Sequence, residues 1–331
     1  MVMSASSFSG FPADARILGL DIGSISVDVV LLDGLGTPLY SRYVRHHGQP
    51  DKVLCAELEA LERTHAGIAA AVTGTGADRV GRLLGACAVN EVIAQVAAAS
   101  FRCPQARSVI DIGGQDSKYI LLEPAGEGNG LRLKDFSVSS MCASGTGSFL
   151  DQQATRLGLD IETEFGEAAL RSRAPARIAG RCSVFAKSDM IHLQQKGTPV
   201  EDIVAGLCHA LARSFKANVV GVKALELPVA LVGGVAANAG VVKALRSVLH
   251  LEEDGLFVPE DFALSGAFGA ALFLLGGQGE AVPYKGLAAF REGLRQRVPM
   301  KTLVPLQPVS VPPPGCRGSS DAGPKVSAGF M

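Results

Sequence analysis

The sequence predicts an α/β protein built from two similar lobes. The first observation is a strand–turn–strand pattern that occurs twice, in residues 16–34 and 108–123. Aligned at an offset of 90 residues, the two copies share the identical pairs Asp21/Asp111, Ile22/Ile112, Gly23/Gly113, Leu31/Leu121 and Leu32/Leu122. Such self-similarity indicates two copies of one supersecondary unit. The second observation is that apolar strands alternate with amphipathic helices elsewhere in the chain, which is typical of α/β lobes.

The bulk properties narrow the class of protein. The 331 residues suffice for one large domain or two smaller ones. Hydrophobic residues make up 47% of the chain, which is enough for a packed core. The net charge of −1 predicts neither a nucleic acid nor an anionic membrane as a partner. No apolar run reaches the ~18 residues of a membrane-spanning helix. Because the first fifteen residues lack a secretory signal and the seven cysteines are irregularly spaced, we expect a cytoplasmic protein with free or metal-bound thiols.

The remaining segments predict further helices and strands. Residues 50–65 place Leu54, Leu58 and Leu61 on one face of a helix. The later elements are a buried strand ending in a glycine turn at 69–76, a long helix at 200–222, a strand, Gly-Gly turn and helix at 227–249, and an alanine-rich helix at 263–275.

Composition also predicts the domain boundaries. From about Gly276 the chain becomes rich in Gly, Pro and Ser, which is typical of a disordered tail. The predicted parts are a flexible N-terminal extension at 1–15, a first lobe at 16–108, a second lobe at 109–278, and an extension with a disordered tail at 279–331.

Each hairpin turn carries an aspartate, glycine, and hydroxyl or amide side chains. Backbone N–H groups that glycine leaves accessible can bind phosphate oxygens, and an aspartate can hold a hydrated Mg²⁺. Two such turns on duplicated lobes could clamp a triphosphate from both sides, whereas either turn alone could equally be an ordinary hairpin. The residues are Asp21, Gly23, Ser24 and Ser26 in the first turn, and Asp111, Gly113, Gly114, Gln115 and Asp116 in the second.

A third glycine turn lies between a predicted strand and a predicted helix. It consists of Gly233 and Gly234, with Asn238 close behind. Because glycine lets a flat base approach the backbone, we expect this turn to contact the adenosine of a nucleotide. A simple packing role for the glycines is the alternative.

Two cysteines precede predicted helices: Cys142 in SSMCASGTGSFLDQQ and Cys182 in GRCSVFAKSDMIH. A helix N-terminus carries about half a positive charge and unpaired N–H donors, which stabilise a thiolate and an anionic cluster bound to it. An iron–sulfur cube takes four thiolates, so two per chain favour a cluster shared across a two-fold dimer. A zinc site is disfavoured because Cys-x-x-Cys pairs are absent from the sequence. A buried structural role is the other alternative.

These motifs resemble those of a known superfamily. The three glycine turns are similar to the two phosphate motifs and the adenosine motif of the duplicated two-lobe fold of actin, Hsp70 and sugar kinases, which is ribonuclease H-like. DIGGQDSK, CASGTGSFL, CSVFAKSD and GGVAANAGVV resemble more closely the BadF/BadG/BcrA/BcrD-type ATPase family. That family contains activators of 2-hydroxyacyl-CoA dehydratases and ATPase subunits of benzoyl-CoA reductase. The resemblance covers residues 17–275.

The resemblance implies an ATPase that passes low-potential electrons from a four-iron, four-sulfur cluster to an acyl-CoA dehydratase or an aryl-CoA reductase. It implies a homodimer that shares the cluster through Cys142 and Cys182, a reduced ferredoxin or flavodoxin as electron donor, and ATP with Mg²⁺ as cofactors. With this function, we expect the catalytic residues to be Asp21, Asp111, Gln115 and Asp116. We expect Gly145 to contact the nucleotide as well.

Two alternatives stay open beside this interpretation. One is a small-molecule kinase of the same superfamily, with Asp111 or Asp116 as the base. The other is a nucleotide-gated, non-catalytic scaffold for a redox enzyme.

The chain departs from the family pattern in two places. Many members carry a lysine near the end of the first phosphate motif, where this chain has Asp28. Members often read Cys-His-Ala after the glutamate that corresponds to Glu91, which VIAQVAAAS follows here. These changes bear on nucleotide affinity and on the partner, and leave the second phosphate motif and both cysteines intact.

Overall fold

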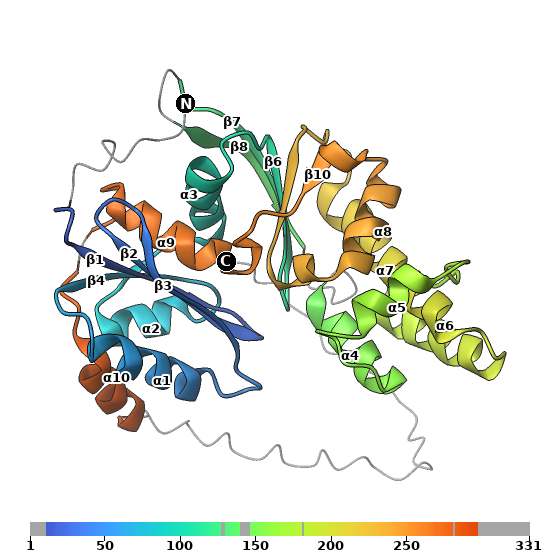
Figure 1. Ribbon diagram of the computed structural model, residues 1–331, viewed down its shortest axis with the longest axis horizontal. Coiled ribbons are helices and arrows are strands. Elements are labelled where there is room, and N and C mark those ends of the chain that lie inside the picture. The colour runs from blue at the N-terminus through green and yellow to red at the C-terminus, as the bar shows by residue number, and fades with distance from the viewer. Residues whose placement is uncertain (1–10, 127–129, 140–145, 181, 281, 297–331) are drawn as a thin grey trace, which may run out of the picture. The chain divides into compact units, whose positions relative to one another are not determined.

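The computed structural model describes residues 11–126, 130–139, 146–180, 182–280 and 282–296. Most of the predicted N-terminal extension, the predicted tail, Cys142 and Gly145 lie outside these residues. Two five-stranded mixed sheets with helices on their faces confirm the predicted fold class (Figure 1). Sheet A has the order β3-β2-β1-β4-β5 and sheet B the order β10-β9-β6-β7-β8. Both belong to one compact unit that ends at Arg295.

Sheet A consists of the first hairpin, strand β3 and two parallel strands. β1 pairs antiparallel with β2 and parallel with β4. Side chains alternate between the faces, so Leu18 and Leu20 pack toward helices α1 and α2, while Ile17 and Val30 pack toward α9. The bounds are β1 Arg16–Ile22, β2 Ser26–Asp33, β3 Pro38–Arg45, β4 Ile68–Thr73, β5 Cys87–Ala88, α1 Pro50–Glu62, α2 Ala77–Leu84 and α9 Ser265–Leu275.

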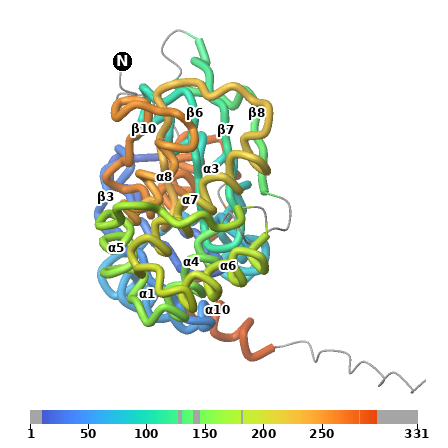
Figure 2. Tube along the Cα trace, turned by 90° about the vertical axis from the view of Figure 1, so that its right-hand side faces the viewer, coloured from blue at the N-terminus to red at the C-terminus, as the bar shows by residue number. Residues whose placement is uncertain are grey.

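Sheet B repeats this arrangement. β6 pairs antiparallel with β7 and parallel with β9. Ile110 and Tyr119 pack toward α4, α5, α7 and α8, while Val109 and Ile120 pack toward α3. Figure 2 looks from the side that carries α5 and α6. The bounds are β6 Ser108–Ile112, β7 Ser117–Pro124, β8 Leu131–Val138, β9 Val229–Val232, β10 Leu256–Phe257, α3 Glu91–Arg102, α4 Gly147–Leu157, α5 Phe165–Arg171, α6 Ser183–Gln195, α7 Val200–Phe215 and α8 Ala239–Leu249.

Helices α3 and α9 pack against each other and connect the two sheets. Their contact requires small residues. A Cβ atom on Gly269 of α9 would overlap the carbonyl oxygen of Ala94 on α3, and a Cβ on Gly19 of β1 would overlap that of Ala267 on α9. The alanine- and glycine-rich composition of α9 therefore lets it lie close to sheet A and to α3 at once.

Several elements differ from the sequence-based expectation. The helix predicted at 200–222 ends as an α-helix at Phe215 and continues as a π-helical turn, Lys216–Val220, before Gly221 adopts a positive φ. Helix α9, which the sequence analysis assigns to the second lobe, packs on sheet A. The segment expected as an extension contains α10, Gly286–Arg295, which packs on α1 and α2. Apolar burial explains this packing, because Leu287 and Phe290 are buried there.

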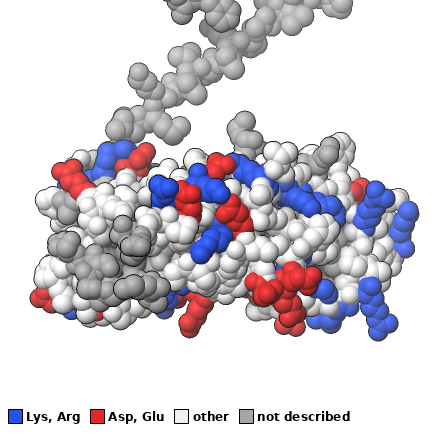
Figure 3. Space-filling view, turned by 90° about the horizontal axis from the view of Figure 1, so that it is seen from above, with Lys and Arg blue, Asp and Glu red and all other residues white. Residues whose placement is uncertain are grey.

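The surface carries charges of both signs. Acidic and basic side chains are interspersed on the face seen in Figure 3, in keeping with the net charge of −1. Within the described part of the chain, the helices are too short or too polar to cross a bilayer.

Candidate active site

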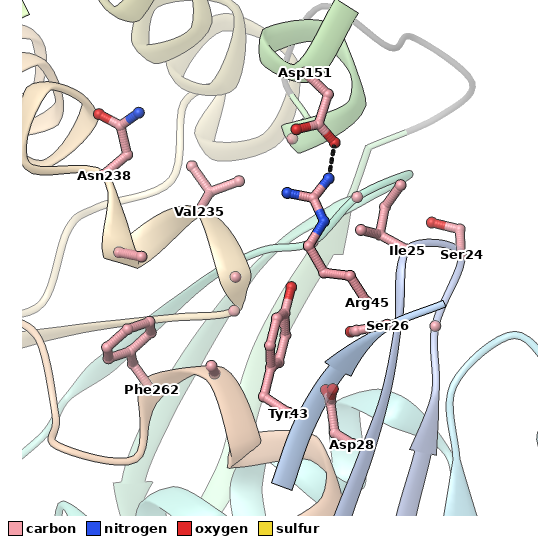
Figure 4. A pocket seen from close by; sticks show the side chains of 18 of the residues that line it. Ser24, Ile25, Ser26, Asp28, Tyr43, Arg45, Asp151, Val235, Asn238 and Phe262 are labelled. Atoms are coloured by element: carbon pink, nitrogen blue, oxygen red, sulfur yellow. Dashed lines mark hydrogen bonds and ion pairs between the residues drawn. The ribbon is translucent and has the colours of Figure 1, made fainter. Parts of the chain in front are cut away.

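A cavity of about 770 Å³ lies where the turns of both sheets meet (Figure 4). The three glycine turns that the sequence singles out, far apart in the chain, all contribute to its wall. The predicted residues that line it are Asp21, Gly23, Ser24, Ser26, Asp111, Gly113, Gly114, Gln115, Asp116, Gly233, Gly234 and Asn238. Cys182 is not among the lining residues.

The two hairpin turns have the same backbone geometry. The amide of Gly23 donates to the carbonyl oxygen of Ser26 at 3.0 Å, and the amide of Gly113 donates to that of Asp116 at 3.0 Å. The two donors are 90 residues apart in the chain, and so are the two acceptors, which is the offset of the sequence repeat. The duplication is therefore present in the hydrogen bonding as well as in the sequence.

A glycine after the neighbouring parallel strand supports each turn aspartate. Gly74 follows β4 and Gly233 follows β9, with φ angles of +86° and +85°. A Cβ on Gly74 would overlap Oδ1 of Asp21, and a Cβ on Gly233 would lie 2.6 Å from Oδ1 of Asp111. Gly266 of α9 packs against Oδ2 of Asp21 in the same way. Because a side chain at any of these glycines would displace a carboxylate, the glycines fix where the two aspartates lie.

Lys118 holds three carboxylates of the cavity wall together. Its Nζ lies 2.6 Å from Glu91, 2.9 Å from Asp116 and 3.6 Å from Asp111. Burial alone would lower the pKa of Lys118, but the three carboxylates outweigh burial and raise it. Gln95 donates to Oδ2 of Asp111 at 3.2 Å. Asp111 is thus held by a charged lysine and by an amide, with a pKa that burial still raises.

The first lobe has a second aspartate where the other lobe has Lys118. Asp28 lies opposite Asp21 in the hairpin register, as Lys118 lies opposite Asp111. Asp28 is 6% exposed, and its Oδ1 has no hydrogen-bond partner among the described residues. Burial and the charge of Asp21 raise the pKa of Asp28 well above its ordinary value. Burial, with the charge of Glu91, raises the pKa of Asp21 to about 7. These buried acids favour a cation or a proton in the cavity.

Asn238 is placed to meet a ligand at the third turn. Its Oδ1 caps helix α8 by accepting from the amide of Val241 at 3.1 Å. Its Nδ2 is buried and has no acceptor among the described residues. At Gly234 a Cβ would lie 2.9 Å from the hydroxyl of Tyr43, so the cavity is narrow there. The cap explains why an asparagine follows the Gly-Gly turn, and the spare amide can donate to a bound molecule.

Sequence reasoning missed part of the cavity wall. Arg45 and Asp151 both line it, and Figure 4 shows the ion pair between them. Glu162 and Phe262 line it as well. These residues carry no local motif, and Arg45 and Asp151 are 106 positions apart. Only the tertiary structure brings them together.

Cys182 begins helix α6, as the sequence predicts. It is the N-cap residue, and it is partly buried. The next turn exposes Val184 and Phe185, each 66% accessible. Cys208 differs from it, because burial raises the pKa of its thiol to about 12. Among the described residues, no group of three or more His, Cys, Asp or Glu side chains could hold a metal ion.

A duplicated α/β fold whose paired aspartate–glycine turns face one cavity defines the class of actin-like ATPases. The family is narrower: the chain belongs to the BadF/BadG/BcrA/BcrD ATPase family, whose model matches residues 18–273. The resemblance identified from the sequence is thereby confirmed.

Three similar proteins give the family its context. The chain is 32% identical over 260 residues to the activator of lactoyl-CoA dehydratase from Anaerotignum propionicum, a match that covers 77% of this chain and 96% of the relative. The solved activator of 2-hydroxyisocaproyl-CoA dehydratase from Clostridium difficile with bound ADPNP has a TM-score of 0.69 at 30% identity, covering 87% of this chain and 99% of that one. Component A of (R)-2-hydroxyglutaryl-CoA dehydratase from Acidaminococcus fermentans has a TM-score of 0.69 at 29% identity. This match covers 78% of this chain and 97% of that one.

The raised pKa of Asp21 predicts a pH-dependent affinity for Mg²⁺. Below pH 7 the carboxyl is mostly protonated, so a Mg²⁺ ion bound there would have to displace a proton, whereas above pH 7 the carboxylate is already formed. We expect the affinity for Mg²⁺ in the presence of ADPNP to rise about tenfold from pH 6 to pH 8, measured by calorimetric titration. Phosphates also titrate near pH 6. The pH dependence that remains in Asp21→Asn therefore measures the contribution of the phosphates. An identical pH profile in wild type and variant would contradict the prediction.

Proposed function

We propose that this protein hydrolyses ATP to drive an electron from an iron–sulfur cluster into a 2-hydroxyacyl-CoA dehydratase. The observation that carries the proposal is the pair of glycine-supported aspartates, Asp21 and Asp111, that face one cavity from the two lobes. The three similar proteins support the choice of partner, because each belongs to a 2-hydroxyacyl-CoA dehydratase system.

The cavity residues fit a nucleotide with Mg²⁺. The glycine turns expose backbone where phosphates could approach, and Asn238 offers a free amide at the adenosine end. Mg²⁺ usually takes one or two carboxylates, several waters and the phosphates themselves. Asp21 and Asp111 would supply those carboxylates, so three converging acidic ligands are not needed. Gln115 and Asp116 line the same wall and would orient the attacking water.

The position of Cys182 fits a cluster ligand. A thiol at the N-cap of α6 lies at the positive end of the helix, where backbone N–H groups could donate to an anionic cluster. Together with Cys142, which lies outside the described residues, it would give two ligands per chain. We propose that two copies share one four-iron, four-sulfur cluster, which would supply a one-electron carrier, and that reduced ferredoxin or flavodoxin donates to it. The exposed Val184 and Phe185 beside Cys182 are suited to an interface.

Reconstitution tests this proposal directly. The full chain, purified without oxygen, is combined with ATP, Mg²⁺, reduced ferredoxin and an unactivated 2-hydroxyacyl-CoA dehydratase. We expect brown protein, ATP hydrolysis, and dehydration that requires ATP and stops when ADPNP replaces it. If the protein activates a benzoyl-CoA reductase and not the dehydratase, the partner is an aryl-CoA reductase and the proposed partner is wrong. Colourless protein that phosphorylates a small molecule would establish the kinase alternative, and a cluster protein without ATP turnover would establish the scaffold.

A further inference from the structure

Arg45 connects the two walls of the cavity. It is the last residue of β3 at the edge of sheet A, and its Nη2 lies 2.7 Å from Oδ2 of Asp151 on α4 (Figure 4). Its Nη1 lies 3.2 Å from Oε1 of Glu162. All three residues line the cavity. The ion pairs therefore run from the first lobe to segments that pack with sheet B.

The two ion pairs differ in their exposure to water. The side chains of Arg45 and Asp151 are 21% and 24% exposed, whereas Glu162 is 62% exposed. Solvent screens exposed pairs and leaves them little net effect. Asp151 is therefore the partner that fixes the guanidinium.

Helix α4 is attached at its start to the second phosphate turn. The amide of Gly147 donates to the carbonyl oxygen of Gly113 at 2.8 Å, and the amide of Ser148 donates to that of Gly114 at 3.0 Å. Asp151 follows about one helical turn later. The beginning of α4 thus contacts the phosphate turn of one lobe and, through Arg45, the other lobe.

One donor of Arg45 is left without a partner. Its Nε is buried and has no acceptor among the described residues. Lys118, also in the cavity wall, is paired with three carboxylates and has little capacity left for a phosphate. A guanidinium suits phosphate oxygens, because its N–H groups form a planar fork. A nucleotide phosphate in the cavity would supply the acceptor that this Nε–H lacks.

We propose that Arg45 binds the nucleotide and fixes helix α4 at the same time: its Nε–H donates to a phosphate oxygen while its Nη2 keeps Asp151. The inference rests on the proposed nucleotide site and extends it. It names Arg45 as the residue through which a bound nucleotide connects the first lobe to α4. Phosphate and Asp151 then fix one guanidinium plane, so each strengthens the other's contact. In the sequence, α4 is the helix that follows Cys142.

The affinity for Mg²⁺–ADPNP tests the binding part. We expect Arg45→Met to weaken binding by about ten- to a hundredfold, the range of a hydrogen bond to a charged group. Asp151→Asn should weaken binding less, and the double variant should lose less than the sum of the two single effects. Arg63→Met is the matched control, because Arg63 forms an exposed ion pair with Glu59 on α1, away from the cavity. If Arg45→Met does not fold, Arg45→Lys keeps the charge without the fork and should still bind more weakly than wild type.

Hydrogen exchange tests the bridging part. In the wild type, ADPNP should slow exchange of the α4 amides, and in Arg45→Met that change should be absent while the β6 amides still respond. Wild-type affinity in Arg45→Met and Arg45→Lys would overturn the inference, and so would weak binding with full protection of α4. If the wild type itself does not bind ADPNP, the proposed function fails as well, and this result is distinct from the others.

Discussion

Asp111→Asn should reduce Mg²⁺-dependent ATP hydrolysis by at least about a hundredfold. Asp111 is 7% exposed and lines the cavity, where Gly233 leaves room for its carboxylate and Gln95 donates to it. Asparagine keeps the shape and one oxygen acceptor, but it removes the charge that would hold Mg²⁺ against the phosphates. Phosphate release measured under saturating ATP gives the rate.

The structure supplies a matched control for this loss. Asp51→Asn removes an aspartate of α1 that pairs with Arg79 on the surface, and it should leave hydrolysis unchanged. Lys118 keeps Glu91 and Asp116 as partners in Asp111→Asn, so the variant should unfold at a temperature close to that of the wild type. Hydrolysis at the wild-type rate in Asp111→Asn would remove Asp111 from the site and, with it, the clamp between the lobes.

The two hairpin turns could be predicted from the sequence because the information that defines them is local. A short apolar strand, a glycine turn and a second apolar strand specify the hairpin without reference to the rest of the chain. The repeat then predicts that Asp21 and Asp111 occupy equivalent places, and their registers agree with this. The family and the fold class follow from the same motifs.

The rest of the cavity depends on contacts that no local pattern encodes. Gly266 reaches Asp21 only because α9 returns to the first sheet, and Arg45 meets Asp151 only after both lobes have folded. An alanine-rich segment such as α9 is compatible with packing on either sheet. In the structure α9 packs closely against Gly19 and therefore lies on sheet A. The shape of the surface of sheet A determines this choice.

Asp28 is an intermediate case, because the sequence shows it as a departure from the family pattern but does not show what surrounds it. The repeat offset pairs it with Lys118, so a cross-strand neighbour of the first aspartate was predictable. That this neighbour is buried, lines the cavity and leaves one oxygen unpartnered among the described residues required the structure. Sequence pattern gives the register of a residue, whereas burial decides its charge state.

Cys182→Ala should abolish iron binding and dehydratase activation while leaving ATP hydrolysis close to the wild-type rate. The structural reason for this split is that Cys182 is at the N-cap of α6, outside the cavity lined by Asp21 and Asp111. Loss of one of two thiolates per chain would remove two of the four that a shared cluster needs. Iron and sulfide assays, the visible spectrum and phosphate release, all made on anaerobically purified protein, measure the three properties together.

Two other cysteines make this last experiment selective. Cys55→Ala removes a thiol that is partly buried like that of Cys182, and Cys208→Ala removes a thiol whose pKa burial raises to about 12, far from that of a thiolate ligand. Both variants should keep full iron and colour. If Cys182→Ala also keeps them, Cys182 only begins a helix and the cluster must be bound elsewhere. If instead it loses ATP hydrolysis together with iron, the cluster supports the fold of the ATPase. Electron transfer and hydrolysis would then not be separable, contrary to what the position of Cys182 outside the cavity wall predicts.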